Sequence, residues 1–568
     1  MTSRHFSIER TSHDIIIKVR LPSPARVVPL AKASFFWLLL VALVTPSILW
    51  IARDRSVWPW DQAWYAEVST DLWFTLTSSP SLWFESMLAA LGTKAPAISW
   101  IGQFFVPLGH ALGSVEAGLL LFVVLTQLGI VYVIWRIAER LDDRSPLTAV
   151  ASSVFTASAP LYVGMSHQYF VEPLQCFAVA WMFYLATTAQ RSRTIVIALA
   201  FVNCLTLGVL AKATTPLYFI FPLGYVVNIL FRRRDWKGSL ASLRQPMLMA
   251  WAIASLAGAG MTAAWYKRNL ALTWFHIKDA SSGTASLDYG WRDTLINKLQ
   301  VWLTLTRESM IIPQCTWFIA LVIALALVMI IYRRFFGQAS GERLSPRDRL
   351  GLLAFSQIWL MLFVVSSNIT VDSRYLYAIL PSISVALIWL LAEARSRALA
   401  MILIAFFILQ WGVANGYALH LTSPMVTSNW LLPYGSDSSR SEDLKRIVRL
   451  TTTDETKFQY HIVGVELPWF NGNSAGFYAA KYRLDVGYRC YYTSLGYAEA
   501  NIDRAMRRVD EVKGAYFISI LPDFVPKPVD FVNRVTIPAV ERVESGGRWL
   551  KVPFQNYNHI IVFRRKLS

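Results

Sequence analysis

The sequence predicts a polytopic α-helical membrane protein, with about 11–13 transmembrane helices followed by a soluble C-terminal α/β domain. The first observation is composition: 55% of the 568 residues are hydrophobic and only 16% are charged, whereas soluble domains carry about 25% charged residues. The second is distribution, because long apolar runs hold the deficit while the C-terminal part of the chain has ordinary soluble composition. The third is that basic residues gather in alternate connections between the apolar runs.

Roughly twenty apolar residues are needed for a helix to cross a bilayer. The chain has runs of this kind near 33–52, 116–135, 146–165, 170–188, 194–211, 213–231, 246–266, 313–332, 349–367, 375–392 and 398–419. The segment 95–112 is ambiguous, because it fits a further pair of spans, a re-entrant piece or an interfacial helix.

The basic residues indicate an orientation. They lie in the N-terminal leader (Arg4, Arg10, Lys18, Arg20, Arg26, Lys32) and in alternate connections (Arg136, Arg140, Arg144; Arg191, Arg193; Arg232, Arg233, Arg234, Lys237; Arg333, Arg334, Arg343, Arg347, Arg349; Arg395, Arg397). Cytoplasmic loops carry such an excess. The N-terminus is therefore expected in the cytoplasm and the C-terminal domain outside it. Because most of the net charge of +18 sits in these loops, it does not indicate nucleic-acid binding.

Three parts follow from this topology. Residues 1–32 form a cytoplasmic basic leader, and the apolar run after it fits a retained signal anchor. Residues 33–420 form the membrane domain, with long outer loops at 53–115 and 267–312, and residues 421–568 form an extracytoplasmic domain. Long loops in compact folds are commonly functional.

In the C-terminal domain the patterns predict helices at 441–450 and 498–512 and strands at 460–466, 515–521 and 559–564. It contains no Gly-rich phosphate-binding loop. The four cysteines, Cys176, Cys204, Cys315 and Cys490, show no CxxC spacing, so neither a disulfide framework nor a zinc site is predicted.

The first outer loop begins with Trp58-Pro59-Trp60-Asp61-Gln62-Ala63-Trp64-Tyr65-Ala66-Glu67. A carboxylate at the membrane surface can accept a proton from an incoming hydroxyl. Asp61 also fits the N-cap of a helix over 62–73, and the two roles are compatible.

Other ionisable residues stand at the predicted outer edge of the membrane. Lys94, in Thr93-Lys94-Ala95-Pro96, fits either an interfacial anchor or a ligand for a lipid-linked phosphate. Glu172 follows His167-Gln168-Tyr169-Phe170-Val171 at the start of a span, and ionisable groups at that depth tend to face a cavity. Lys212 gives a weaker signal of the same kind.

Two arginines interrupt the scarcity of cations on the outer side. Arg268 lies in Trp265-Tyr266-Lys267-Arg268-Asn269, and Arg374 lies in Asp372-Ser373-Arg374-Tyr375. Arg binds phosphate in bidentate fashion, although an interfacial anchor explains each alone. Together, these carboxylates and cations on one face are expected for a site that handles an anionic, lipid-linked substrate.

The order of these motifs resembles the GT-C superfamily of membrane glycosyltransferases, in the branch of the protein O-mannosyltransferases and the lipid A aminoarabinose transferase. The resemblance rests on six motifs in order over spans one to ten. They are Asp61 to Glu67, Lys94-Ala95-Pro96, Glu172-Pro173, Leu210-Ala211-Lys212-Ala213-Thr214-Thr215-Pro216, Trp265 to Asn269, and Arg374-Tyr375-Leu376-Tyr377-Ala378-Ile379-Leu380-Pro381.

The resemblance implies transfer of a hexosyl or pentosyl group from a polyprenyl-phosphate donor to a lipid, polysaccharide or protein acceptor, on the non-cytoplasmic face of a bacterial inner membrane. Asp61 and Glu172 would be the catalytic carboxylates. Lys94 and Arg374, with Arg268 as a further candidate, would bind the donor phosphate. The substrate-positioning residues would be Tyr65, Tyr375 and His167.

Two departures from the family pattern concern the acceptor and any metal. Gln62 stands where the family often has a second acidic residue, and Glu172 stands where Asp is commoner. The pattern requires no cofactor. It leaves the use of a divalent cation open, although the neutral Gln62 argues against a metal site because hard cations favour paired carboxylates. One alternative is a transporter of a lipid-linked or sugar substrate, but the two halves of the chain show none of the hydropathy symmetry that is common in transporters. The other alternative is a membrane scaffold with a binding domain.

Overall fold

The computed structural model describes most of the chain. The described residues are 6–11, 14–19, 24–143, 145–233, 235–282, 290–336, 345–422, 431, 433–496, 498–525, 531–555 and 558–566. Five of the basic residues used for the topology prediction lie outside them: Arg4, Arg20, Arg144, Arg234 and Arg343. The chain divides into two compact units, Met1–Thr45 and Pro46–Ser568.

The first unit contains a hairpin that the sequence analysis does not predict. Strands β1 (Phe6–Thr11) and β2 (Asp14–Val19) pair antiparallel, with Ile8 opposite Ile17. Helix α1 (Pro24–Arg53) follows and contains the first predicted span.

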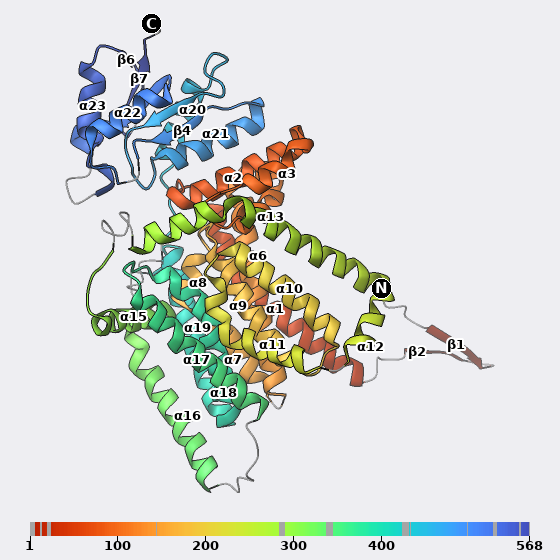
Figure 1. The fold of residues 1–568 in the computed structure, drawn as a ribbon. Coiled ribbons are helices and arrows are strands. Elements are labelled where there is room, and N and C mark those ends of the chain that lie inside the picture. Colours follow the sequence, from red (N-terminus) through yellow and green to blue (C-terminus); the bar gives the residue numbers. More distant parts are fainter. Residues whose placement is uncertain are drawn as a thin grey trace. The chain divides into compact units, whose positions relative to one another are not determined.

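The predicted spans coincide with helices (Figure 1). They are α1, α6 (Val115–Leu141), α7 (Pro146–Ser158) with α8 (Pro160–Met165), α9 (Glu172–Thr188), α10 (Thr194–Ala211), η2 (Thr215–Phe219) with α11 (Ile220–Arg232), α13 (Pro246–Ser282), η4 (Pro313–Cys315) with α16 (Thr316–Phe336), α17 (Pro346–Ser367), η5 (Ser373–Ile379) with α18 (Leu380–Ala394), and α19 (Arg397–Ala418). Within the described ranges, nine helical segments are long and apolar enough to cross a membrane. The polytopic helical fold class is therefore confirmed.

Two predicted spans, at 146–165 and 170–188, are not among these nine helical segments because their helices are shorter. The run at 146–165 breaks between Ser158 and Pro160, because proline has no N–H to continue the helical ladder. Helix α9 has 17 residues and is buried along most of its length. Segment 95–112 forms short pieces, α4 (Ala97–Gly102), η1 (Gln103–Phe105) and α5 (Val106–Ala111), which together are too short for a pair of spans.

The two long connections predicted as outer loops contain helices. The first holds α2 (Trp60–Ser78) and α3 (Pro80–Ala89). In the second, α13 continues to Ser282 and α15 (Leu295–Met310) follows. Two further short pieces, α12 (Trp236–Ala241) and η3 (Ser242–Arg244), precede α13.

The start of α2 corrects the prediction that Asp61 is an N-cap. Pro59 holds that position in an extended conformation, and no side chain caps the helix. Asp61 instead lies in the first turn, where a carboxylate interacts favourably with the positive end of the helix dipole. Asp61 therefore still lies at the end of α2 that favours a negative charge, but it does not cap the helix.

The C-terminal domain is an α/β domain with one mixed sheet in the order β4-β3-β5-β7-β6. Strand β3 (Tyr460–Val463) is parallel to β4 (Tyr491–Ser494) and β5 (Tyr516–Ile520), whereas β7 (Ile560–Arg565) is antiparallel to β5 and β6 (Trp549–Val552). The other elements are α20 (Ser439–Thr451), α21 (Gly472–Val486), α22 (Ile502–Val512), η6 (Pro522–Phe524), η7 (Phe531–Asn533) and α23 (Thr536–Ser545).

Two apolar clusters cover the two faces of this sheet. Leu444, Ile447 and Ala475 of α20 and α21 pack with Val463 and Ile518. On the other face Val509 and Val540 of α22 and α23 pack with Ile462, Phe517 and Phe563. Successive strand residues point to opposite faces, so the central strands β3, β5 and β7 contribute to both clusters. The five predicted elements of the domain are present; α21, α23, β4 and β6 are not among the predicted elements.

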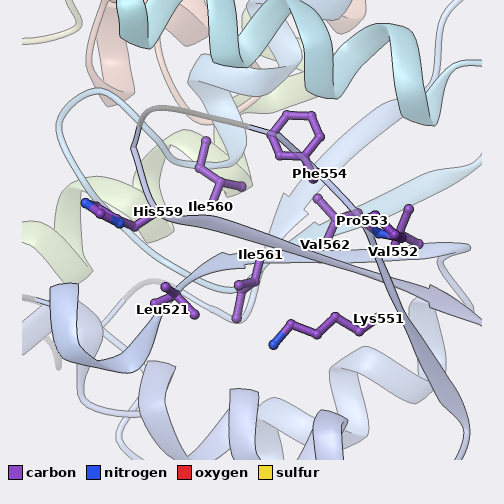
Figure 2. A pocket seen from close by; sticks show the side chains of 9 residues that line it. All are labelled: Leu521, Lys551, Val552, Pro553, Phe554, His559, Ile560, Ile561 and Val562. Atoms are coloured by element: carbon purple, nitrogen blue, oxygen red, sulfur yellow. The ribbon is translucent and has the colours of Figure 1, made fainter.

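A pocket of about 530 Å³ lies beside β6 and β7 of the C-terminal domain (Figure 2). Its lining includes Leu521, Lys551, Phe554 and His559. None of the predicted site residues lines it.

Candidate active site

The first pair of predicted site residues is in direct contact. The Nζ atom of Lys94 lies 2.6 Å from Oδ2 of Asp61, and their side chains are 21% and 29% exposed. Asp61 comes from the first turn of α2, whereas Lys94 precedes α4. The ammonium group also faces the rings of Trp64 and Tyr65 at 5.4 and 5.7 Å. Asp61 is thus paired with a cation, Lys94, that also lies against two aromatic rings.

Helix α13 holds the turn that carries Lys94. Trp265 donates its indole N–H to the carbonyl of Ala90 at 3.0 Å, and Asn269 donates to the carbonyl of Leu88 at 2.8 Å. The turn includes Leu91, a non-glycine residue at φ 61°, a conformation that requires support from its surroundings. The Trp265–Asn269 motif therefore positions the segment before Lys94.

A second cluster gathers around Glu172, the first residue of α9. Its side chain is 2% exposed, and its Oε1 atom lies 3.0 Å from Nζ of Lys212 and 4.0 Å from Nε of Arg374. Asp372 caps the start of η5 and lies 2.6 Å from Nε of Arg374. Two carboxylates and two cations thus share this site, which offsets the cost of burying Glu172.

Aromatic rings border the second cluster. Lys212 faces the ring of Tyr375 at 4.5 Å, and the guanidinium of Arg374 faces the ring of Phe170 at 5.1 Å. The arrangement is suited to an anionic group with an adjacent apolar or sugar portion.

Electrostatic effects in α2 connect the two clusters. Burial raises the pKa of the Asp61 carboxyl. Lys94, and after it Arg374, lower this pKa by more than burial raises it, so that it lies below its usual value. Burial raises the pKa of Tyr65 well above its usual value, and the charges of Asp61 and Glu172 raise it further. The carboxylates and cations of both clusters therefore act on one another across a single site.

His167 lies among the buried residues of this region. Its ring stacks on Trp50 with centroids 4.3 Å apart, and only 5% of the residue is exposed. Neither ring nitrogen has a hydrogen-bond partner among the residues that the structure describes. Tyr65 is also buried, at 3% exposed.

Arg268 is not brought to these clusters. It is 45% exposed and lies 3.7 Å from Glu85, which is 70% exposed. The other members of its motif, Trp265 and Asn269, point to the turn before Lys94 instead.

Gln62 has a structural role next to Asp61. It is 5% exposed, and its side-chain oxygen accepts the backbone N–H of Tyr169 at 3.2 Å. Its amide nitrogen lies 3.4 Å from the side-chain oxygen of Gln168. These contacts hold the segment that leads into Glu172.

The carboxylates of the site do not form a metal-binding set. Asp61 and Glu172 each pair with a lysine, and no group of three or more His, Cys, Asp or Glu side chains in the described part of the chain could hold a metal ion. Hard cations require several oxygen ligands, so these residues do not fit a divalent cation.

Two members of the site, Lys212 and Asp372, are not among the predicted site residues. The sequence signal for Lys212 is a lysine at the predicted outer end of a span, and Asp372 lies two residues before Arg374. The contact of Asp372 with Arg374 is local, whereas Lys212 meets Glu172 from 40 residues away, a pairing that the sequence does not show by itself.

Comparisons of the sequence find no matching protein-family model and no matching curated protein. Comparison of the structure finds ArnT from Cupriavidus metallidurans bound to undecaprenyl phosphate, with TM-score 0.55 and 12% identity over 95% of this chain and 98% of that chain. It also finds the arabinofuranosyltransferase AftD from Mycobacteria, with TM-score 0.52 and 13% identity over 93% of this chain and 40% of that chain. The protein therefore has the fold of the GT-C glycosyltransferases, in an ArnT-like form.

Proposed function

We propose that this protein is a glycosyltransferase that moves a sugar from a polyprenyl-phosphate donor to an acceptor on the non-cytoplasmic face of the membrane. The observation that carries the proposal is the convergence of Asp61, Lys94, Glu172 and Arg374 in one site. An ArnT structure with a similar fold is bound to undecaprenyl phosphate. That ligand supports a lipid phosphate as the group that the cations of this chain receive.

The donor phosphate enters from the bilayer, where an unpaired anion is costly. Lys94 and Arg374 provide positive charge beside the apolar helices, and Arg374 adds the planar fork that matches a phosphate. As the bond between the sugar anomeric carbon and the phosphate oxygen breaks, both electrons stay on the phosphate. Cations already in position stabilise this growing charge more in the transition state than in the ground state.

The acceptor hydroxyl supplies the new bond to the anomeric carbon. Its oxygen attacks that carbon, and its proton passes to the carboxylate of Asp61. Glu172 orients the sugar or the acceptor. The products are the glycosylated acceptor and the polyprenyl phosphate.

The pairing of Asp61 with Lys94 links donor binding to proton transfer. Lys94 lowers the basicity of Asp61. A phosphate that draws the ammonium toward itself weakens this effect, and Asp61 then becomes a better base. Proton abstraction is thereby favoured when the donor is in place.

The site is expected at the outer face of a bacterial inner membrane, and the acceptor is a lipid, polysaccharide or protein. The transferred group is a hexosyl or pentosyl unit. The sugar itself is identified by mass spectrometry of lipids that co-purify with the protein.

The test uses the purified full-length protein in detergent. Native mass spectrometry measures binding of undecaprenyl phosphate to the wild type, to the double variant Lys94→Ala with Arg374→Ala, and to the control Arg307→Ala, whose arginine pairs with neighbouring Glu308 at 3.0 Å. We expect the wild type and the control to bind and the double variant to lose binding.

Transfer is measured as release of undecaprenyl phosphate from hexose- and pentose-linked donors in the presence of membrane-derived acceptor. A wild-type protein that neither binds undecaprenyl phosphate nor releases it from any such donor contradicts the proposed function.

A further inference from the structure

Helix α2 presents different faces to the active site and to the C-terminal domain. Asp61, Tyr65 and Ser69 lie four residues apart and so share one face, with Ser69 hydrogen-bonded to Tyr169 at 2.9 Å. Glu67 and Asp71 share another, because successive helical residues are separated by about 100°. Contacts made to the second face therefore act on the same helix that carries Asp61.

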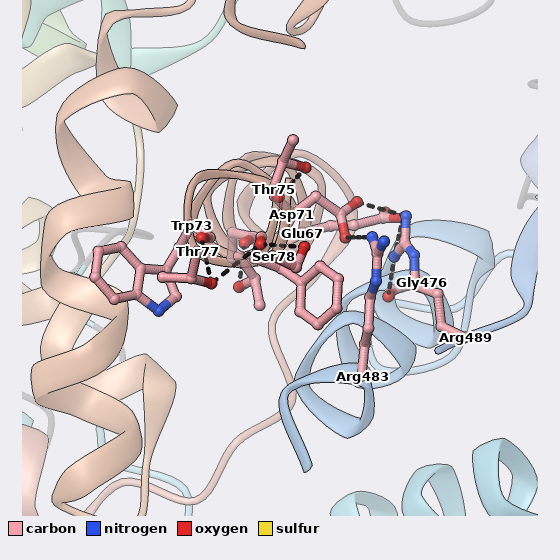
Figure 3. A network of polar contacts seen from close by, with 12 residues as sticks. Glu67, Asp71, Trp73, Thr75, Thr77, Ser78, Gly476, Arg483 and Arg489 are labelled. Atoms are coloured by element: carbon pink, nitrogen blue, oxygen red, sulfur yellow. Dashed lines mark hydrogen bonds and ion pairs between the residues drawn. The ribbon is translucent and has the colours of Figure 1, made fainter. Parts of the chain in front are cut away.

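Arg489 of the C-terminal domain binds this second face (Figure 3). Its Nη1 atom lies 2.8 Å from Oε1 of Glu67, and its Nη2 atom lies 2.5 Å from Oδ2 of Asp71. Nη1 also donates to the carbonyl of Gly476 in α21 at 3.1 Å. One guanidinium thus joins two carboxylates one helical turn apart to the neighbouring helix.

The contact is buried and closely fitted. The Arg489 side chain is 4% exposed. A Cβ atom at Gly476 would lie 2.5 Å from Oε2 of Glu67, so the absence of a side chain there allows the two helices to approach. Burial raises the pKa of Glu67 to about 7, and Arg489 acts in the opposite direction by favouring the charged form of this carboxyl.

The beginning of α2 is held by the same domain. Ser474 donates its hydroxyl to the carbonyl of Trp58 at 2.8 Å, and Asn473 donates to the carbonyl of Trp60 at 3.3 Å. The indole N–H of Trp60 donates to Glu466 at 3.1 Å. These contacts fix the backbone immediately before Asp61, while Arg489 fixes the next turns.

We propose that Arg489 is a positioning residue for the transfer reaction, through which the C-terminal domain sets the position of α2 and hence of Asp61. The inference rests on the proposed function for its catalytic consequence. Its structural consequence, the ordering of α2, is independent of that function.

The chain offers a matched control for a contact that merely attaches the domain. Lys481, which lies in α21, is 2.5 Å from Glu116 of α6, with both side chains about one-fifth exposed (19% and 21%). This bridge connects α21, which Arg489 contacts at Gly476, to the membrane domain, but neither of its residues belongs to α2. Lys481→Ala therefore removes an attachment and leaves the carboxylates of α2 paired.

The experiment compares full-length Arg489→Ala, Arg489→Lys and Lys481→Ala with the wild type. Transfer kinetics give kcat and KM, native mass spectrometry gives undecaprenyl phosphate affinity, and hydrogen exchange gives the protection of amides 61–71. Thermal unfolding reports any general loss of stability.

For Arg489→Ala we expect kcat to fall about 10- to 100-fold, since small misplacements of catalytic groups have effects of this size. Undecaprenyl phosphate affinity should stay within about twofold, because Lys94 and Arg374 are untouched. Amides 61–71 should exchange at least about tenfold faster, as local opening becomes easier. Arg489→Lys should recover part of kcat, since it keeps the charge without the fork.

Two results overturn the inference. One is unchanged protection of amides 61–71 in Arg489→Ala, which shows that α2 does not depend on this contact. The other is a parallel loss of kcat, donor affinity and stability in Arg489→Ala and Lys481→Ala, which shows an attachment role only. If the wild type transfers no sugar, the proposed function fails, and the exchange measurement still decides the role of Arg489.

Discussion

The carboxylate of Asp61 and the ammonium of Lys94 lie 2.6 Å apart, and each neutralises the other. A carboxylate in such a pair is a weak base, because its cation stabilises the deprotonated form. The pair therefore connects the two functions proposed for this site, phosphate binding and proton abstraction, in one contact. Substitutions of the two residues are expected to have different consequences.

Asp61→Asn should abolish most of the transfer without unfolding the protein. The helix does not require a side-chain cap at this position, and Asn has nearly the same shape as Asp. Removal of the base is expected to lower single-turnover transfer by about 100-fold or more. Undecaprenyl phosphate binding should be kept, since Lys94 is then released from its pair. A folded Asn variant with wild-type transfer would contradict the role of Asp61.

Lys94 and Arg374 should both affect the donor. Lys94→Ala and Arg374→Ala are each expected to lower donor affinity and transfer, because the phosphate loses a cation that stabilises its developing charge. Arg374→Lys should remain impaired, since the bidentate fork is lost. The measurements are undecaprenyl phosphate binding and single-turnover transfer. Two single variants that bind and transfer like the wild type would place the phosphate elsewhere.

Arg268 provides a contrasting expectation. The structure places it in an exposed ion pair with Glu85, and exposed ion pairs contribute little to protein stability. Arg268→Ala should therefore change undecaprenyl phosphate affinity by less than about twofold. A loss comparable to that of Arg374→Ala would show that Arg268 reaches the donor.

The sequence allowed prediction of the membrane helices because the bilayer requires a long apolar run for each of them. The same reasoning could not predict α21. This helix lies between the sheet and α2, so several of its faces are buried and it lacks the clear polar and apolar sides seen in α22. Length and periodicity alone therefore did not distinguish it from a loop.

The site residues were found by a different kind of signal. Asp61, Lys94, Glu172 and Arg374 stand out because ionisable groups are rare at the ends of apolar runs. The same signal selected Arg268, which the structure places in an exposed ion pair. Contacts such as Lys212 with Glu172 or Arg489 with Glu67 join residues far apart in sequence, and periodicity contains no information about such pairings.

His461 should make the stability of the protein sensitive to acid. It is fully buried in the C-terminal domain, and burial lowers its pKa from 6.5 to about 4. Between these values the unfolded chain binds a proton that the folded chain does not, so stability is lost as pH falls from about 6.5 to about 4. The full effect is about 3 kcal/mol.

The measurement is thermal unfolding of the full-length protein at several pH values across this range. His461→Gln should weaken the pH dependence, whereas His559→Gln, at an exposed position, should retain it. An unchanged slope in His461→Gln would assign the acid sensitivity to other groups.

The orientation of the chain is the last prediction, and the proposed function depends on it. The segments at 53–115 and 368–374 and the start of the span at 170–188 are all expected on the outer side, and the structure brings Asp61, Arg374 and Glu172 from them into one site. The C-terminal domain contacts the same region, since Arg489 binds α2. A single orientation measurement on this domain therefore places the active site as well.

Ser436 is an exposed residue of the C-terminal domain and is suited to cysteine labelling. Cys176, Cys204 and Cys490 are buried, and Cys315 is partly exposed, so Ser436→Cys is introduced together with Cys315→Ser. In intact cells a membrane-impermeant thiol reagent should label this variant, because basic connections place the N-terminus in the cytoplasm. The Cys315→Ser parent is the control and should stay unlabelled. Labelling that occurs only from the cytoplasmic side would reverse the orientation and place the proposed site on the wrong face for its donor.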